Sequence, residues 1–361
     1  MMISEEYKKL IYLLACAVNQ SIPEKEIVDS LDYDTLFEIA SFHKLTSIVS
    51  LALKSAGVNE ENFEHARKKE IWKYLINEEQ RIDVTNKLEE SGIKYCVLKG
   101  EVLKHYYPKT EMRQMADIDI LYDSGKSEEV RRIMEGLGFS SEKNGSGHQD
   151  DYIKYPVSHF EMHRVLFAKD ENERFFTYYN RVFDRLLKDN DNGYSYRFTK
   201  EDFYIYLVAH EFKHYFWRGT GLRFVLDTYV YLKREELDWN YIFTELAALD
   251  LVQFEENNRK LAEKLFSNKE TEFSEDETKM LEYLVNSGAY GLVENEIKNG
   301  IKQYGKMHYV VRRIFPSTSA LQKHYPIFYK YRIILPLLPF FRILRGWKRA
   351  INEIILLCTY R

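Results

Sequence analysis

The chain has 361 residues, of which 45% are hydrophobic and 30% charged, and its formal net charge at pH 7 is −4. This composition excludes an intrinsically disordered chain, and the length favours two or three packed units over one compact core. The three cysteines lie far apart and form no CxxC pair, which argues against a disulfide framework or a zinc knuckle. The chain starts without the apolar core of a signal peptide, and its longest apolar run, residues 333–341, is too short to cross a bilayer. We therefore expect a cytoplasmic protein without a transmembrane segment.

Hydrophobic periodicity divides the chain into four regions. Residues 1–90 have the apolar spacing of amphipathic helices and predict a helical N-terminal region. Residues 91–170 mix strand and helix patterns and predict a small α+β core. Residues 171–312 are helical again, with a break near Gly219–Gly221, and residues 313–361 form a basic, aromatic C-terminal segment.

The core region alternates between the two patterns. Short helices are predicted at 101–107 and 124–139, and a polar loop at 141–150. A tight turn is expected at Pro156, between the last two strands. The predicted strands are 93–98, 117–123, 151–156 and 158–167.

Charge is distributed unevenly along the chain. Residues 301–361 contain twelve Lys and Arg and a single acid, a net charge of +11, whereas the first 300 residues carry −15. Such a segment either docks on its own acidic chain or binds an anionic partner, such as nucleic acid or a membrane surface. The sequence leaves both possibilities open.

Two aspartates lie one residue apart in the apolar run "ADIDILY". Because strand side chains alternate between faces, Asp117 and Asp119 point the same way. Mg²⁺ prefers oxygen ligands, and Glu161 offers a third carboxylate from a later strand. Three carboxylates on neighbouring strands are the minimum for a two-metal phosphoryl or nucleotidyl transfer site. The simpler interpretation is an edge strand that faces water.

Three residues upstream have the chemistry to hold phosphate. Gly100 follows the first strand and opens a short helix, where the backbone can approach an anion. Arg113 can pair with phosphate oxygens through two nitrogens, and Lys99 can do so as a point charge. His163 shares a strand face with Glu161 and is either a structural histidine or a neighbour of the site.

These residues resemble the uncharacterised bacterial nucleotidyltransferase family of the DNA polymerase β-like superfamily. The likeness covers residues 93–167 and extends to 210–227. It implies a mixed-sheet core and a Mg²⁺-dependent enzyme with an NTP substrate. The motifs that carry it are Leu98-Lys99-Gly100, Tyr107-Pro108, Arg113, Asp117-Ile118-Asp119 and Glu161-Met162-His163.

On this basis we expect transfer of an NMP from an NTP to an acceptor hydroxyl, with release of pyrophosphate. Two Mg²⁺ ions, with Mn²⁺ as an alternative, are expected on Asp117, Asp119 and Glu161, which are the predicted catalytic residues. Lys99, Gly100, Arg113 and His163 are the predicted nucleotide-binding residues. RNA, protein and small molecules are all open as acceptors, and neither base preference nor oligomeric state follows from the sequence.

Three alternatives remain at this point. Glu101 departs from the family, which has a small residue at this position. A carboxylate beside a triphosphate would repel the triphosphate, unless the helix turns the carboxylate away. One alternative is therefore a catalytically inactive nucleotide-binding module. A DxD glycosyltransferase would require a long parallel-sheet domain before the DxD, which the helical pattern of 4–90 argues against. Finally, "HEFKH" (210–214) is formally the HExxH motif of zinc proteases, with Glu255 or Asp227 as a third ligand by position.

Overall fold

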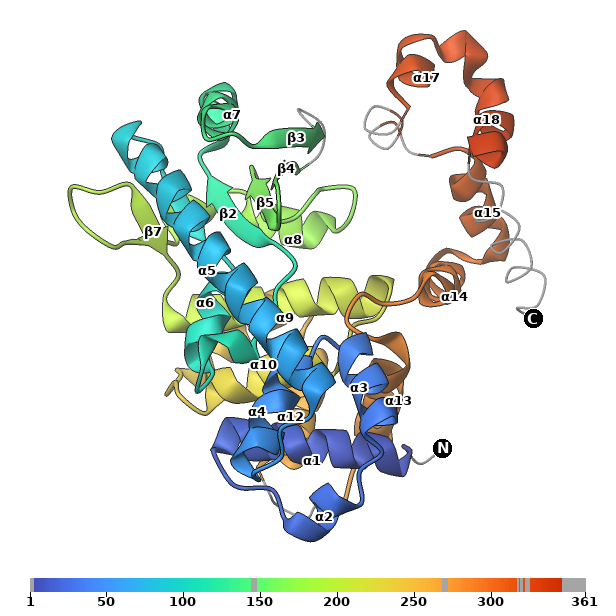
Figure 1. The fold of residues 1–361 in the computed structure, drawn as a ribbon. Coiled ribbons are helices and arrows are strands. Elements are labelled where there is room, and N and C mark those ends of the chain that lie inside the picture. Colours follow the sequence, from blue (N-terminus) through green and yellow to red (C-terminus); the bar gives the residue numbers. More distant parts are fainter. Residues whose placement is uncertain are drawn as a thin grey trace.

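One mixed β-sheet lies at the upper left of Figure 1, with helices on both of its faces. The computed structural model describes residues 3–143, 148–267, 272–316, 318, 321 and 325–345. Within these residues the protein is mostly helical with a single seven-stranded sheet, so the predicted α+β class with a mixed-sheet core between helical regions is confirmed. None of the described helices is long and apolar enough to span a membrane.

The N-terminal region is helical, as predicted. The first helix begins after Ser4, whose side chain accepts a hydrogen bond from the Tyr7 N–H, and its apolar face buries Leu10 and Leu14. The longest helix of this region extends from the N-terminal helices to the sheet (Figure 1). The elements are α1 (Glu5–Asn19), α2 (Lys25–Asp29), α3 (Tyr33–Phe42), α4 (Thr46–Ser55) and α5 (Glu61–Glu90).

The strands that carry the acidic motifs lie at the centre of the sheet, whose strand order is β3-β4-β5-β2-β1-β7-β6. β2 is parallel to β5 and antiparallel to β1, while β4 and β5 form an antiparallel hairpin around Pro156. A short helix, α6 (Gly100–Leu103), follows the first strand. The strands are β1 (Tyr95–Val97), β2 (Ile118–Tyr122), β3 (Ser140–Lys143), β4 (Gln149–Lys154), β5 (Ser158–His163), β6 (Leu187–Lys188) and β7 (Ser195–Arg197).

Two expectations about this sheet are wrong. The polar loop expected at 141–150 begins inside β3 and ends inside β4, and the region expected to be helical from 171 onward contains β6 and β7. β7 pairs in parallel with β1, and β6 pairs with β7. Strands of two to four polar or exposed residues have no alternating hydrophobic pattern, so only their pairing partners define them.

The two faces of the sheet are covered by different helices. On one face, Ile118 and Ile120 pack with Val84 of α5 and with α7 (Ser127–Gly136). On the other face, Leu121 packs in a core with α8 (Glu173–Tyr179) and α9 (Lys200–Trp217). Because side chains alternate along β2, Asp119 lies on the same face as Leu121, toward α9.

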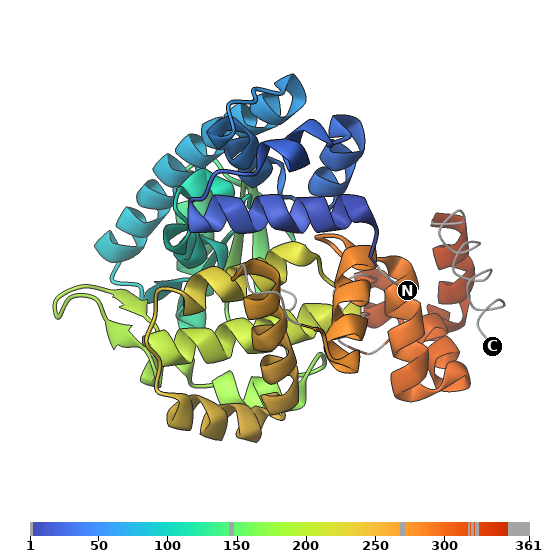
Figure 2. The same cartoon turned by 90° about the horizontal axis from the view of Figure 1, so that it is seen from below.

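The C-terminal helices share a core with the N-terminal ones. Leu226 of α10 (Leu222–Leu232) and Leu261 of α12 belong to the same cluster of buried residues as Leu14 of α1. Figure 2 shows the N-terminal helices lying against this part of the chain. The predicted break at Gly219–Gly221 separates α9 from α10. The other helices are α11 (Trp239–Leu249), α12 (Val252–Phe266), α13 (Glu275–Ser287) and α14 (Val293–Tyr304).

The last described helices project away from the body at the right of Figure 1. They are α15 (Lys306–Ile314), α17 (Pro326–Lys330) and α18 (Leu338–Arg345). Several large apolar side chains here are exposed, among them Ile333 at 90% and Phe340 at 68%. Residues 346–361, the end of the predicted basic segment, lie outside the described residues.

Candidate active site

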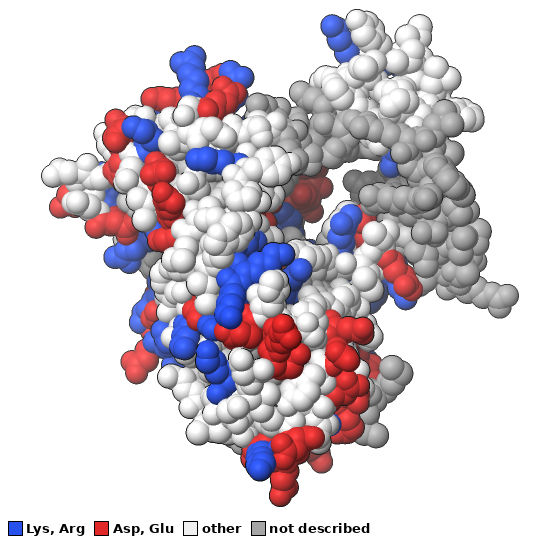
Figure 3. Space-filling view, in the orientation of Figure 1, with Lys and Arg blue, Asp and Glu red and all other residues white. Residues whose placement is uncertain are grey.

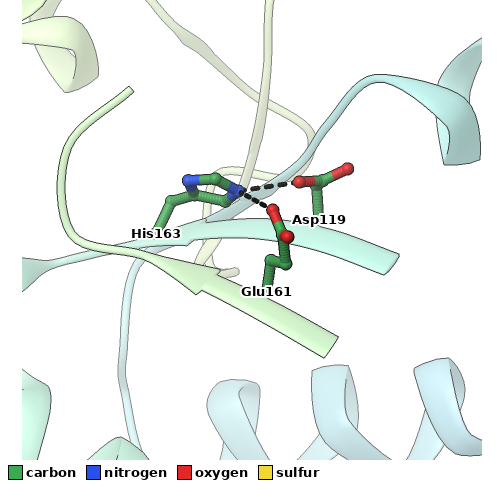
Figure 4. A group of neighbouring side chains, drawn as sticks. All are labelled: Asp119, Glu161 and His163. Carbon is green, nitrogen blue, oxygen red and sulfur yellow. Dashed lines mark hydrogen bonds and ion pairs between the residues drawn. The ribbon is translucent and has the colours of Figure 1, made fainter. Parts of the chain in front are cut away.

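The parallel pairing of β2 with β5 brings two of the predicted acids together. Asp119 is directly opposite Glu161 in the register, and His163 lies two residues further along β5. His163 Nε2 is 2.7 Å from Asp119 Oδ1 and 3.6 Å from Glu161 Oε2, and Figure 4 shows the three side chains converging on one face of the sheet. The sheet thus forms a cluster of two carboxylates and one imidazole.

Lys99 supplies a positive charge to this cluster. Its Nζ is 2.6 Å from Asp119 Oδ1 and 4.0 Å from Glu161 Oε2. Its backbone has φ +47° and ψ −116°, which is rare for a residue with a side chain and costs about 1–3 kcal/mol. Burial opposes charge on both partners, but the attraction between them raises the pKa of Lys99 and, together with His163, holds the pKa of Asp119 well below its usual range.

Asp117 lies immediately before β2 and lines the same cavity as the other two acids. Burial, followed by repulsion from Asp119 and Glu161, raises the pKa of Asp117 to about 6. Asp117 shares the cavity with the other two acids, but the three do not form a group whose ligand atoms all lie within 4.8 Å of one another. A cation between them would relieve this repulsion.

The donor set fits a divalent cation. Asp119, Glu161 and His163 each offer one ligand atom, and these atoms lie within 4.8 Å of one another. The ammonium of Lys99 already lies against two of these groups, as a cation would. Carboxylate oxygens suit Mg²⁺, and the imidazole nitrogen makes Mn²⁺ equally compatible.

A second group of metal-ligand type shares Glu161. Asp151 on β4 is directly opposite Glu161, and with His159 of β5 the three ligand atoms again lie within 4.8 Å. Neither Asp151 nor His159 is among the metal ligands predicted from the sequence. A hairpin centred on Pro156 pairs 151 with 161 by simple counting, so the register was the signal that could have found Asp151.

Gly100 and Arg113 meet at the wall of the cavity. A Cβ at Gly100 would clash with the Arg113 guanidinium and lie 2.7 Å from Met115 Sδ, so a side chain here would require both neighbours to move. Arg113 donates from Nε and Nη2 to the two oxygens of Asp227, both at 2.9 Å, and Tyr107 donates to the same carboxylate at 2.7 Å. Arg113 therefore lines the cavity with its charge paired to Asp227.

Glu101, the residue that departs from the family, does not line the cavity. Its side chain is buried, with Oε2 2.7 Å from Lys104 Nζ and 3.4 Å from Arg81 Nε. The α6 helix has thus turned the carboxylate away, and two cations compensate it. The repulsion that motivated an inactive module has no structural basis at this residue.

The cavity above the acids has a volume of about 1030 Å³. Residues from the sheet, α9, α10 and α14 line it, including Lys99, His210, Arg223 and Tyr290. On the face drawn in Figure 3 the molecule is hollowed between its body and the C-terminal helices, and both acidic and basic atoms are visible there. This volume is enough for a nucleotide-sized ligand.

The HExxH residues do not form a zinc-protease site. His210 and His214 lie on one face of α9, with their Nε2 atoms 3.0 Å apart, at the cavity. Glu211 instead accepts hydrogen bonds from Thr228 and Asn258 in the helical core. Among the described residues, neither histidine belongs to a three-ligand group. The two residues considered as a third zinc ligand bind other partners. Asp227 pairs with Arg113, and Glu255 binds Tyr204 and Arg259.

The fold and this cluster define the class of protein. It is an α+β protein with acids on adjacent strands beneath a large cavity, and a lysine that follows the first strand lies beside these acids. The comparison with protein families is consistent with this description. Residues 29–267 match the model of a family described as uncharacterised nucleotidyltransferase, and the chain belongs to that family. Neither a curated protein nor a solved structure matches the chain.

Proposed function

We propose that this protein is a Mg²⁺-dependent enzyme that transfers an NMP from an NTP to an acceptor hydroxyl and releases pyrophosphate. The observation that carries the proposal is the pairing of Asp119 with Glu161 on parallel strands, with Asp117 and Lys99 at the same cavity floor. Family membership supports the reaction class. RNA, protein and small molecules remain possible acceptors.

Divalent ions would supply Lewis-acid stabilisation of the reacting phosphate when bound. Asp117, Asp119 and Glu161 would hold them, and Glu161, whose side chain is 20% exposed, would take the proton of the acceptor hydroxyl. Lys99 and His163 orient the Asp119 carboxylate through hydrogen bonds of 2.6 and 2.7 Å. Gly100 and Arg113 form the adjacent wall, where the triphosphate is expected.

The alternatives have less support. Five helices and a single three-residue strand precede α6 and β2 among the described residues, so the long parallel-sheet domain of a DxD glycosyltransferase is absent there. An inactive module of the same fold would keep the nucleotide site but transfer nothing. Only measured turnover separates that module from the enzyme.

Calorimetric titration of each NTP in Mg²⁺ tests the site. We expect binding by the wild-type protein and a loss of at least tenfold in Asp119→Ala, because the remaining acids would hold the metal–triphosphate complex less well. Asp123, just after β2, is partly exposed and does not line the cavity, so Asp123→Ala is the matched control and should bind normally. Absence of Mg²⁺-dependent NTP binding by the wild type would overturn the proposal.

A further inference from the structure

Most of the basic side chains at the cavity are already paired with a carboxylate. Lys99 pairs with Asp119, Arg113 with Asp227, and Lys213 with Glu171, at distances of 2.6 to 2.9 Å. Arg218 likewise lies 2.7 Å from Glu296. These cations have little charge left for a ligand.

Three other cations have no such partner. Arg223 of α10 lines the cavity. Lys73 of α5 and Lys44 of the α3–α4 loop do not line it, but Arg223 and Lys44 both repel the Lys73 ammonium. Within the described part of the chain, none of the three has a carboxylate oxygen within 4.0 Å. Each is at least partly buried, where an unpaired charge is costly.

The backbone holds two of these cations next to Asp117. Arg223 Nη1 donates to the carbonyl of Gln114 at 2.6 Å, and Lys73 Nζ donates to the next carbonyl, that of Met115. These carbonyls belong to the segment that leads to Asp117. A single carbonyl leaves most of the guanidinium donors and two ammonium donors for another ligand.

Burial disfavours the charge on two of these cations. Burial, followed by the proximity of Arg113, lowers the pKa of Arg223, while burial lowers that of Lys73 despite Glu70 and Asp117. The charges of Arg223 and Asp117 both act on Tyr290, and Lys44 is 5.6 Å from the centre of the Tyr290 ring. Asp117 is itself a proposed metal ligand, so an ion there would leave the cations still less compensated.

We propose that Arg223, Lys73 and Lys44 form a phosphate-binding subsite beside Asp117. The ligand is a phosphate group, which accepts from guanidinium and ammonium donors and would neutralise the three charges. The triphosphate of an NTP and a phosphate on the acceptor are the two sources. This inference rests on the proposed function for its biological meaning, but the anion site itself needs no turnover.

The test is calorimetric binding of inorganic tripolyphosphate, inorganic phosphate, ATP and adenosine to the full chain without metal. Arg223→Met and Lys73→Met should each weaken tripolyphosphate binding by roughly ten- to a hundredfold, the effect of losing a hydrogen bond between charged groups. Arg234→Met is the matched control. Arg234 also donates to a backbone carbonyl, that of His105 at 2.9 Å, but this carbonyl lies outside the 114–117 segment that Lys73 and Arg223 contact.

The pattern across probes identifies the source. Equal losses for ATP and tripolyphosphate, with adenosine unaffected, assign the subsite to the NTP. Loss for inorganic phosphate with ATP unchanged assigns it to the acceptor. The free energy of unfolding without ligand checks folding, and removal of an unpaired charge should leave it unchanged or higher.

Two results would overturn the subsite. One is binding of every phosphate probe by Arg223→Met and Lys73→Met as tightly as by the wild type. The other is an equal loss in Arg234→Met. If the wild type binds tripolyphosphate through Arg223 but transfers no nucleotide, the subsite stands and the proposed enzyme fails. If nucleotide transfer is the same in the wild type and in Arg223→Met, the proposed enzyme stands and the subsite fails.

Discussion

At the scale of single residues, Lys99 explains how Asp119 keeps its charge at a buried position opposite Glu161. Its ammonium lies against Asp119 and near Glu161, so it offsets part of their mutual repulsion. Its unusual backbone places this side chain at the cavity floor and starts α6 at Gly100. Asp117 makes no such ion pair with Lys99, and burial, followed by repulsion from the other acids, raises its pKa.

Glu101 gives a prediction about stability and not about catalysis. Glu101→Gln should lower the free energy of unfolding by about 3 kcal/mol, because it breaks a buried ion pair with Lys104. Chemical denaturation measures this change. The affinity for NTP should stay within about twofold, since the side chain does not line the cavity.

Glu90→Gln is the control for this change. Glu90 pairs with Lys87 at an exposed position, so its loss should cost less than about 1 kcal/mol. Tighter NTP binding by Glu101→Gln would contradict the account, since it would mean that the Glu101 charge does reach the triphosphate.

At the scale of elements, much of the sheet follows from the sequence. β1, β2 and β5 have enough apolar residues to be recognised, and the alternation along β2 places Asp119 on the correct face. β6 and β7 escape detection because they are short and have no buried stripe. The pair Arg113–Asp227 joins residues 114 apart, and Lys73 and Arg223 come from two different helices, α5 and α10, so no local pattern could predict that these residues meet.

The contact between the α3–α4 turn and the start of α10 depends on a neutral histidine. His43 is fully buried, accepts the Leu222 N–H at Nδ1, and has its Nε2 3.3 Å from the Tyr7 hydroxyl. Burial lowers the pKa of His43 from its ordinary 6.5 to about 4. Between these two pH values the unfolded chain binds more protons than the folded one, so stability falls as pH decreases.

We therefore expect His43 to account for roughly 2–3 kcal/mol of the stability lost between pH 7.5 and 4.5. Urea denaturation at both pH values measures this loss. His43→Gln should be less stable at pH 7.5 but should lose correspondingly less on acidification. An identical pH dependence in the wild type and the variant would show that His43 does not titrate in this range.

At the scale of the whole molecule, the cavity lies where the sheet, α9 and α10 meet, and α14 and α15 contribute Glu296 and Tyr309 to its rim. The shared core of the N-terminal and C-terminal helices fixes α10 relative to α5, and so fixes Arg223 relative to Lys73. Among the residues after 312 that the structure describes, none belongs to the three cores. An anionic partner for this segment stays a prediction.

The most direct test of the central claim is nucleotide transfer itself. The protein is incubated with Mg²⁺, each NTP labelled at the α-phosphate, and a bacterial lysate, and covalent label and pyrophosphate are measured. We predict that the wild type attaches label to an acceptor and that Asp119→Asn does so at least about a thousandfold more slowly, whereas Asp123→Asn is unchanged. Mg²⁺-dependent NTP binding without any transfer of label, or equal transfer by Asp119→Asn, would contradict the account.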